Sequence, residues 1–185
     1  PPSYSFVDEE LILGALPNEW LSGLSFRPDL AMFANNSVAE AAPPCAPFYA
    51  DVAAYTPELA PGLPATAILR CATDSLLSLQ GKGGYADYEE FPLAAGAPLD
   101  CAWLTVAASG DWEWAAQRRD ALARWAGLLL ALEYGQTGLA ASRHTGRPDD
   151  SPFFTSSWWD SFRSGHLESF NCAMLYRAAG RAAEL

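Results

Sequence analysis

Basic residues are scarce in this chain. Its 185 residues include 11 Lys and Arg against 22 Asp and Glu, which gives a formal net charge of −11 and a pI of about 4.4. Phosphate binding requires clustered Lys and Arg, so this balance argues against a nucleic-acid partner. An acidic surface does not repel neutral molecules such as sugars, although it identifies no particular ligand.

Long apolar runs are also missing. The longest candidate, Ala126 to Leu132, is far shorter than the roughly 20 residues that a membrane-spanning helix needs, so we predict no membrane partner. The chain opens with two prolines, without an initiator Met or the basic segment that begins a signal peptide. At the other end a helical pattern still runs, without a Gly or Pro stop. We therefore expect a segment of a longer protein, and the sequence assigns no compartment, cytoplasmic or secreted.

The cysteines show no metal-binding spacing. Cys45, Cys71, Cys101 and Cys172 form no CxxC pair, and the two His residues are distant from them in sequence. We therefore predict no metal site, and no cofactor is indicated. Cys71, Cys101 and Cys172 fall in helical patterns beside Ala and Leu, where a buried thiol is the ordinary outcome.

β-Branched residues are sparse and Ala is frequent, which favours helices over strands. Pro interrupts the first sixty residues often enough to argue against long strands there, and we expect short helices near Asp8–Leu16 and Pro28–Ala39. Residues 1–63 are interpreted as the N-terminal part of one domain, and residues 64–185 as its helical-hairpin segment.

From Pro64 onward the pattern predicts four longer helices. They cover Pro64–Gln80, Leu99–Ser109 after Pro98, Asp111–Glu133, and a last helix from about His166. Gly81 and Gly110 are typical stops, and Asp111 is a typical N-cap. The expected buried faces are Ala67, Ile68, Cys71, Leu76 and Leu79 in the first helix; Trp114, Ala121, Leu122, Trp125, Leu128, Leu129 and Leu132 in the third; and Leu167, Phe170, Asn171, Met174, Leu175 and Ala178 in the last.

These patterns predict an all-α fold of antiparallel helical hairpins. Two long loops interrupt it, a Gly-rich one after Gly81 and another from Gly135 to Ser157, and loops of this length are often functional. Two helices separate the loops, and alternate loops of a hairpin bundle lie at the same end. We therefore expect both loops at one end of the bundle, where they could form one pocket.

The second loop ends in Ser157-Trp158-Trp159-Asp160-Ser161-Phe162-Arg163, which combines two indoles, a carboxylate and a guanidinium. Indole faces pack against the C–H faces of sugars, a carboxylic acid can protonate a glycosidic oxygen, and an Arg can hold a ring hydroxyl. The alternatives remain open. Asp160 could cap a helix or turn, one indole could belong to the core, and Arg163 could anchor the loop by an ion pair.

The chain resembles the glycoside hydrolases with an (α/α)6 toroid, of the trehalase, processing α-glucosidase and glycogen-debranching type. Three features carry the resemblance from about Pro64 to Leu185. The first is the Trp-Trp-Asp-Ser-Phe-Arg motif, which is similar to the family's Gly-Trp-Asp-x-Ser-x-Arg type. The others are the helix Ser169-Phe-Asn171-Cys-Ala-Met-Leu175-Tyr176 with Ala183-Glu184-Leu185, and the run from Ala97-Pro98-Leu99 through Ser109-Gly110-Asp111-Trp112 to Arg124-Trp125.

The resemblance implies about half of a toroid, in which Asp160 is the general acid and the general base belongs to a later part. Its substrates would be α-glucosides or related oligosaccharides, and the segment alone would be inactive. Trp158, Trp159 and Arg163 would bind the sugar, with Asp100 and Tyr85 as further candidates. Asp100 could instead interact with the positive end of a helix. Tyr85 lies in a loop rich in acidic residues, and that loop could simply be exposed to solvent without binding a ligand.

Other polar and aromatic residues have plainer expectations. Trp112 and Trp114 are expected to cover the core at a helix start. His144 and His166 are expected to face solvent or cap a helix. Asn171 is expected to bond backbone in the core, with a substrate contact as the alternative. Two competing functions remain: a carbohydrate-binding protein of the same fold without catalysis, and a helical scaffold or interaction domain.

Overall fold

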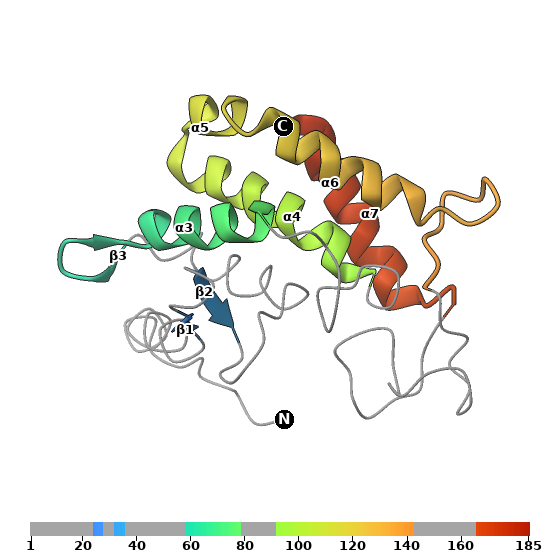
Figure 1. Cartoon of the computed structure of the whole chain (residues 1–185), viewed down its shortest axis with the longest axis horizontal. Coiled ribbons are helices and arrows are strands. Elements are labelled where there is room, and N and C mark those ends of the chain that lie inside the picture. Colours follow the sequence, from blue (N-terminus) through green and yellow to red (C-terminus); the bar gives the residue numbers. More distant parts are fainter. Residues whose placement is uncertain (1–23, 28–31, 36–57, 79–91, 143–165) are drawn as a thin grey trace, which may run out of the picture.

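The computed structural model describes residues 24–27, 32–35, 58–78, 92–142 and 166–185. Within these ranges the fold is all-α in class: five helices pack together, and the strands are limited to two short antiparallel hairpins (Figure 1). The helices are α3 (Ala65–Ser78), α4 (Leu93–Ser109), α5 (Trp112–Ala116), α6 (Arg119–Ala131) and α7 (Ser169–Glu184). The hairpins pair β1 (Leu24–Arg27) with β2 (Met32–Asn35), and β3 (Glu58–Ala60) with β4 (Leu63–Pro64).

Helix α4 forms the centre of the structure. A helix that is apolar on every side is stable only when it is covered on every side, and α4 is buried almost throughout its first fourteen residues, 93–106. Helices α3, α6 and α7 all pack against it. The predicted hairpin alternation is present, because α3 and α6 run antiparallel to α4 (Figure 1).

The predicted beginning of α4 is wrong, although its end is confirmed. The helix begins at Leu93 rather than Leu99, so Pro98 lies inside it. An internal Pro removes a backbone hydrogen bond and costs about 3 kcal/mol, and burial of the apolar residues 93–97 offsets that cost here. The helix ends at Gly110, whose φ of 69° is the left-handed conformation that Gly adopts without strain.

Helix α3 is confirmed, but its buried face differs from the predicted one. Leu76 is buried as expected, whereas Ala67 and Cys71 are exposed. The buried face instead includes Thr73, whose hydroxyl lies 3.1 Å from that of Thr105 in α4. Each hydroxyl also donates to a carbonyl of its own helix, so this polar pair is satisfied inside the core.

The single helix predicted from Asp111 is divided into α5 and α6. Asp111 does cap it, since its carboxylate accepts from the Trp114 backbone N–H at 3.0 Å. The backbone leaves helical geometry at Arg118 (φ −108°, ψ 9°). There the guanidinium pairs with Asp74 of α3 and lies 4.5 Å from the centroid of the Trp114 ring. Asp74 is 44 residues away in sequence, so local periodicity does not reveal this pairing.

The buried positions predicted for the third and last helices are confirmed with one exception: Leu167 is half-buried and precedes α7. Trp114, Leu122, Trp125, Leu129 and Leu132 are buried, and Ala121 and Leu128 pack against the same core. In α7, Asn171, Leu175 and Ala178 are buried, and Phe170 and Met174 pack against the core. Helix α7 begins at Ser169, where the Glu168 carboxylate accepts from two backbone N–H groups.

The helix predicted at Pro28–Ala39 is wrong where the structure describes it. Residues 32–35 form strand β2, which pairs with β1 so that Leu24 is opposite Asn35. Pro is typical of both the first turn of a helix and the second position of a β-turn, so Pro28 alone does not distinguish the two. The helix expected at Asp8–Leu16 lies outside the described residues.

Candidate functional site

Most of the predicted sugar site falls outside the described residues. Trp158, Trp159, Asp160 and Arg163 belong to residues 143–165, and Tyr85 belongs to residues 79–91. The pocket expected between those two segments therefore stays a prediction. Only Asp100, among the predicted site residues, lies in the described part of the chain.

The described helices do fix where both segments join the bundle. Helices α4 and α7 lie side by side and run in the same direction (Figure 1). Contacts ascend together along both helices, from Gly96 with Leu175 to Trp103 with Glu184. The segments that precede α4 and α7 therefore attach at the same end, as the order of the helices predicted.

Asp100 lies at the centre of the α4–α7 contact. Its side chain is only 2% exposed, and its carboxylate accepts from Arg177 at 2.6 and 3.1 Å and from Arg181 at 3.0 Å. The alternative that Asp100 interacts with a helix N-terminus is wrong, because α4 begins at Leu93. Both carboxylate oxygens are occupied by guanidinium groups, so the geometry gives Asp100 a structural role in holding α7.

Trp103 and Glu184 extend the cluster of Asp100, Arg177 and Arg181 toward the C-terminal end of α7. The Arg181 guanidinium lies 4.5 Å from the centroid of the Trp103 ring, and the Trp103 indole N–H donates to Glu184 at 2.7 Å. Two carboxylates thus balance two guanidinium groups. The cluster was not predicted from the sequence. The signal was the spacing of Arg177 and Arg181, four residues apart and hence on one face of a helix.

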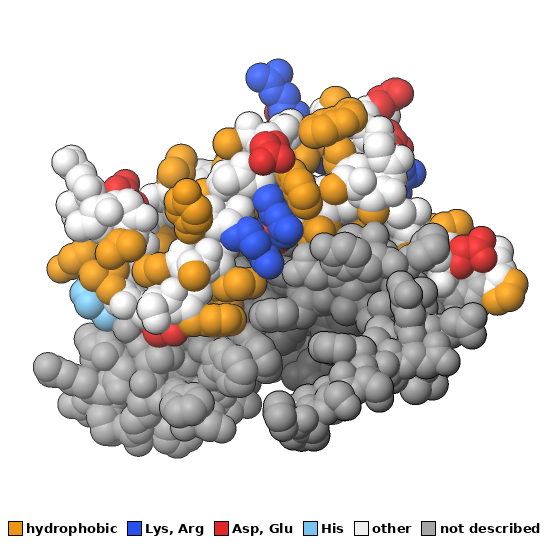
Figure 2. Space-filling model, turned by 180° about the vertical axis from the view of Figure 1, so that it is seen from behind, with side chains coloured by type: hydrophobic (Ala, Val, Ile, Leu, Met, Phe, Trp, Pro, Cys, Tyr) orange, Lys and Arg blue, Asp and Glu red, His pale blue; other side chains and the backbone are white. Residues whose placement is uncertain are grey.

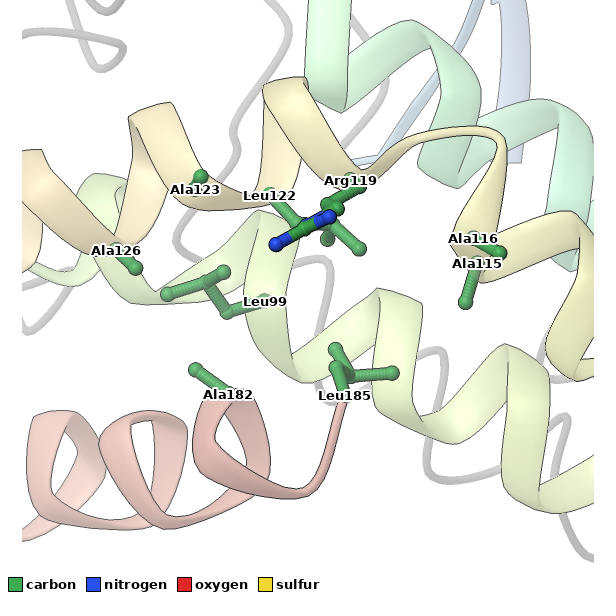
Figure 3. Close-up of a pocket in the computed structure, with 9 residues that line it drawn as sticks. All are labelled: Leu99, Ala115, Ala116, Arg119, Leu122, Ala123, Ala126, Ala182 and Leu185. Carbon is green, nitrogen blue, oxygen red and sulfur yellow. The ribbon is translucent and has the colours of Figure 1, made fainter.

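Two apolar grooves lie along the seam between α6 and α7. One has a volume of about 330 Å³, and Figure 3 shows Arg119 and Ala126 of α6 on one side of it and Ala182 and Leu185 on the other. The second has a volume of about 240 Å³ and is lined by Leu130 and Glu133 from one side and by Tyr176 from the other. These grooves were also missed, although Arg124 is the only charged residue between Ala121 and Leu132.

The remaining sequence-based expectations have mixed outcomes. Trp114 is buried as expected, but Trp112 is 55% exposed, because it occupies the first position of α5 and points away from the core. His166 is exposed as predicted, with its ring edge against Tyr134 at 4.8 Å between centroids. Cys101 is buried as expected and Cys172 is half-buried. His144 and Cys45 lie outside the described residues.

In the described ranges, no three His, Cys, Asp or Glu side chains are grouped closely enough to hold a metal ion. None of the helices described in those ranges has the length and apolarity required to cross a bilayer.

A comparison of the chain with protein-family models, with curated proteins and with solved structures found no match.

Proposed function

We propose that this chain is part of an inverting glycoside hydrolase that acts on α-glucosides or related oligosaccharides, with Asp160 as the general acid. The general base lies outside this chain in the proposal. The observation that carries the proposal is that α4 and α7 pack side by side and run in the same direction. Helix α6, which lies between them in the sequence, runs in the opposite direction. This alternation supports a hairpin toroid, because the beginnings of α4 and α7 lie at the same end of the bundle. In the proposal, the segment with Tyr85 and the segment with Trp158-Trp159-Asp160 form one site at that end.

The helices also carry the other motifs of the resemblance. The Gly110-Asp111 turn ends α4 and caps α5, and Trp125 of α6 is buried with its indole N–H on the Leu77 carbonyl. Asn171 and Leu175 lie on the buried face of α7. These positions support the proposed fold because each motif coincides with the kind of element in which the family has it.

The proposed chemistry requires two carboxyl groups on opposite sides of the scissile bond, separated by about 6.5–9.5 Å so that a water fits between. Asp160 is protonated at rest and gives its proton to the leaving oxygen. Trp158 and Trp159 form apolar walls for the sugar ring. Walls that exclude water favour the protonated form of a carboxyl, whereas a neighbouring Arg163 guanidinium favours the ionised form. Arg163 and Tyr85 bind hydroxyl groups. Asp100 supports the site by holding α7, the helix that follows the motif.

Sugar binding tests the walls of the site in the chain itself. Replacing Trp158 and Trp159 by Ala should weaken binding of an α-linked glucose oligosaccharide by about tenfold or more, because the stacking surface is lost. Saturation-transfer NMR measures the affinity. Trp112→Ala is the matched control, since Trp112 is an exposed indole outside the Trp158-Trp159-Asp160 segment and its loss should leave binding unchanged. Equal binding by all three proteins would contradict the proposed walls.

Turnover tests the acid. In a protein that contains both carboxylates, Asp160→Asn should lower kcat by about 10²–10⁴-fold while sugar binding persists, because an amide cannot protonate the leaving oxygen. Unchanged turnover would remove Asp160 from the mechanism.

A non-catalytic domain of the same fold is the alternative, and one observation favours it. The α6–α7 seam is an apolar surface of the kind that contacts other proteins. Sugar binding without turnover identifies a carbohydrate-binding domain, and the absence of both identifies a helical scaffold.

A further inference from the structure

The outer surface of α6 and α7 is uncharged over most of its length. Exposed positions on it include Ala123, Gly127 and Leu130 of α6, and Tyr176, Ala179 and Ala183 of α7. Leu130 is 71% exposed and Tyr176 is 83% exposed, so two of the largest apolar side chains on this surface contact little of the chain. Figure 2 shows hydrophobic and charged side chains interspersed over one face of the described part of the molecule.

This uncharged surface is hollowed rather than flat. Helices α6 and α7 run antiparallel, and the two grooves open at either end of the seam between them, with Leu99 of α4 in the wall of one. Along α6, from Arg119 to Ala131, the seam is about 18 Å long at 1.5 Å per residue. Its length and apolar lining are those of a site for a helix.

The charges of the seam lie at its two ends, and they are of opposite sign. Arg119 lines the groove at one end, and Glu133 lines the groove at the other. Arg119 and Glu133 are both exposed. A two-fold axis perpendicular to α6 and passing near Ala126 would place Arg119 of each copy opposite Glu133 of the other. The surface is therefore complementary in charge to itself.

The shape of the surface agrees with the same axis. Antiparallel α6 helices that are centred near Ala126 bring Leu130 of one copy against Ala123 of the other, where a small side chain leaves room for it. On α7 the corresponding alignment brings Tyr176 of one copy near Leu185 of the other. An interface of this kind is isologous, because the same patch is used by both partners.

We propose that a second copy of this chain docks on this surface, so that α6 and α7 of both copies form a four-helix interface. Burial of Leu130 and Tyr176 supplies the main attraction, since removal of apolar surface from water drives association. The Arg119–Glu133 pairs at the rim fix the antiparallel orientation, because like charges would meet in the parallel one. The proposal is independent of the catalytic role of Asp160.

Sedimentation equilibrium on the chain, from low to high micromolar concentration, tests this interface. The unaltered chain should show a concentration-dependent monomer–dimer equilibrium. Leu130→Glu should weaken it by about a hundredfold, because a charge would be buried in the apolar centre. Circular dichroism checks that each variant is folded, which we expect because every altered side chain is exposed.

Charge exchange tests the orientation. Arg119→Glu and Glu133→Arg alone should each weaken the dimer by about tenfold, since each replaces two attractive rim pairs by two repulsive ones. The double variant R119E/E133R should regain most of the affinity, because the pairs form again with reversed sign. Glu58→Arg, an exposed charge reversal on β3, is the control and should have no effect.

Two results would overturn the proposal. One is a monomer at every concentration, which is the expected outcome if a helix of another protein occupies the seam. The other is a dimer in which the double variant is no tighter than either single variant, because the charges would then not face each other.

Discussion

Helix α7 has two neighbours and contacts them in different ways. Against α4 it lies so close that a Cβ added at Gly96 would be 2.9 Å from Leu175 and 3.0 Å from Ala178. Against α6 it leaves a seam with apolar grooves. The contact with α4 is also the more extensive of the two.

The difference lies in what each neighbour offers to α7. Helix α4 presents a Gly that admits Leu175 and a buried carboxylate that admits only a cation, so one register of α7 satisfies both. Helix α6 presents mostly Ala and Leu, which contact α7 without specifying one position. A buried polar group that is satisfied in a single geometry is a device for specificity, and we offer that role for Asp100 as a hypothesis.

Of the changes that test the difference between the α4–α7 and α6–α7 contacts, removal of the Asp100 charge should lower the free energy of unfolding most. Asp100→Asn leaves two guanidinium groups facing each other with one fewer acceptor, and we expect a loss of about 3–5 kcal/mol in the free energy of unfolding. Urea denaturation measures it. Asp74→Asn is the matched control, because Asp74 also pairs with an Arg but is 42% exposed, and its loss should cost about 1 kcal/mol or less. Equal losses would remove the special role of the α4–α7 contact.

Two neighbouring leucines of α6, one buried and one exposed, allow its inner and outer surfaces to be compared by the same substitution. Leu129 is 7% exposed and belongs to the core, whereas Leu130 is 71% exposed on the seam side. Leu129→Ala should cost about 2–5 kcal/mol by opening a cavity, and Leu130→Ala less than about 0.5 kcal/mol. The measurement is thermal unfolding at a concentration where the chain is monomeric. A large loss for Leu130→Ala under that condition would mean that its exposed surface is already packed within one copy.

Two helical glycines should respond in opposite directions to the same substitution. Gly96→Ala places a methyl group against Leu175 and Ala178, and we expect a net loss of about 1–2 kcal/mol despite the better helix propensity of Ala. Gly127 in α6 has no atom within 4 Å of an added Cβ, so Gly127→Ala should raise stability by about 0.5–1 kcal/mol. Urea denaturation of the monomer checks both. A gain at Gly96 would show that α7 can move away from α4 at little cost.

The sequence predicted most helices and the C-terminal end of α4 because those features have local causes. A Gly at position 110 supplies a left-handed backbone, Asp111 supplies an acceptor for an N–H three residues later, and apolar spacing marks the inner surface of α6 and α7. Each cause involves residues within one or two helical turns.

The errors share a different physical origin. The beginning of α4 depends on burial that offsets the cost of Pro98, the division at Arg118 on Asp74 in another helix, and the buried surface of α3 on Thr105. Strand β2 depends on its pairing with β1. Partners of this kind are distant in sequence, so no local pattern contains them. The sugar site stays a prediction for another reason: Asp160, Trp158, Trp159, Arg163 and Tyr85 all lie outside the described residues.

By itself, the sequence determined that the chain is acidic, that it is helical, and where α4 ends, because composition and local hydrogen bonding decide these properties. Only the tertiary structure decided that Asp100 is bound by Arg177 and Arg181, and that α6 and α7 leave an apolar seam between them. The reason is that burial and ion pairing depend on which helices meet, and that is a property of the packed chain as a whole.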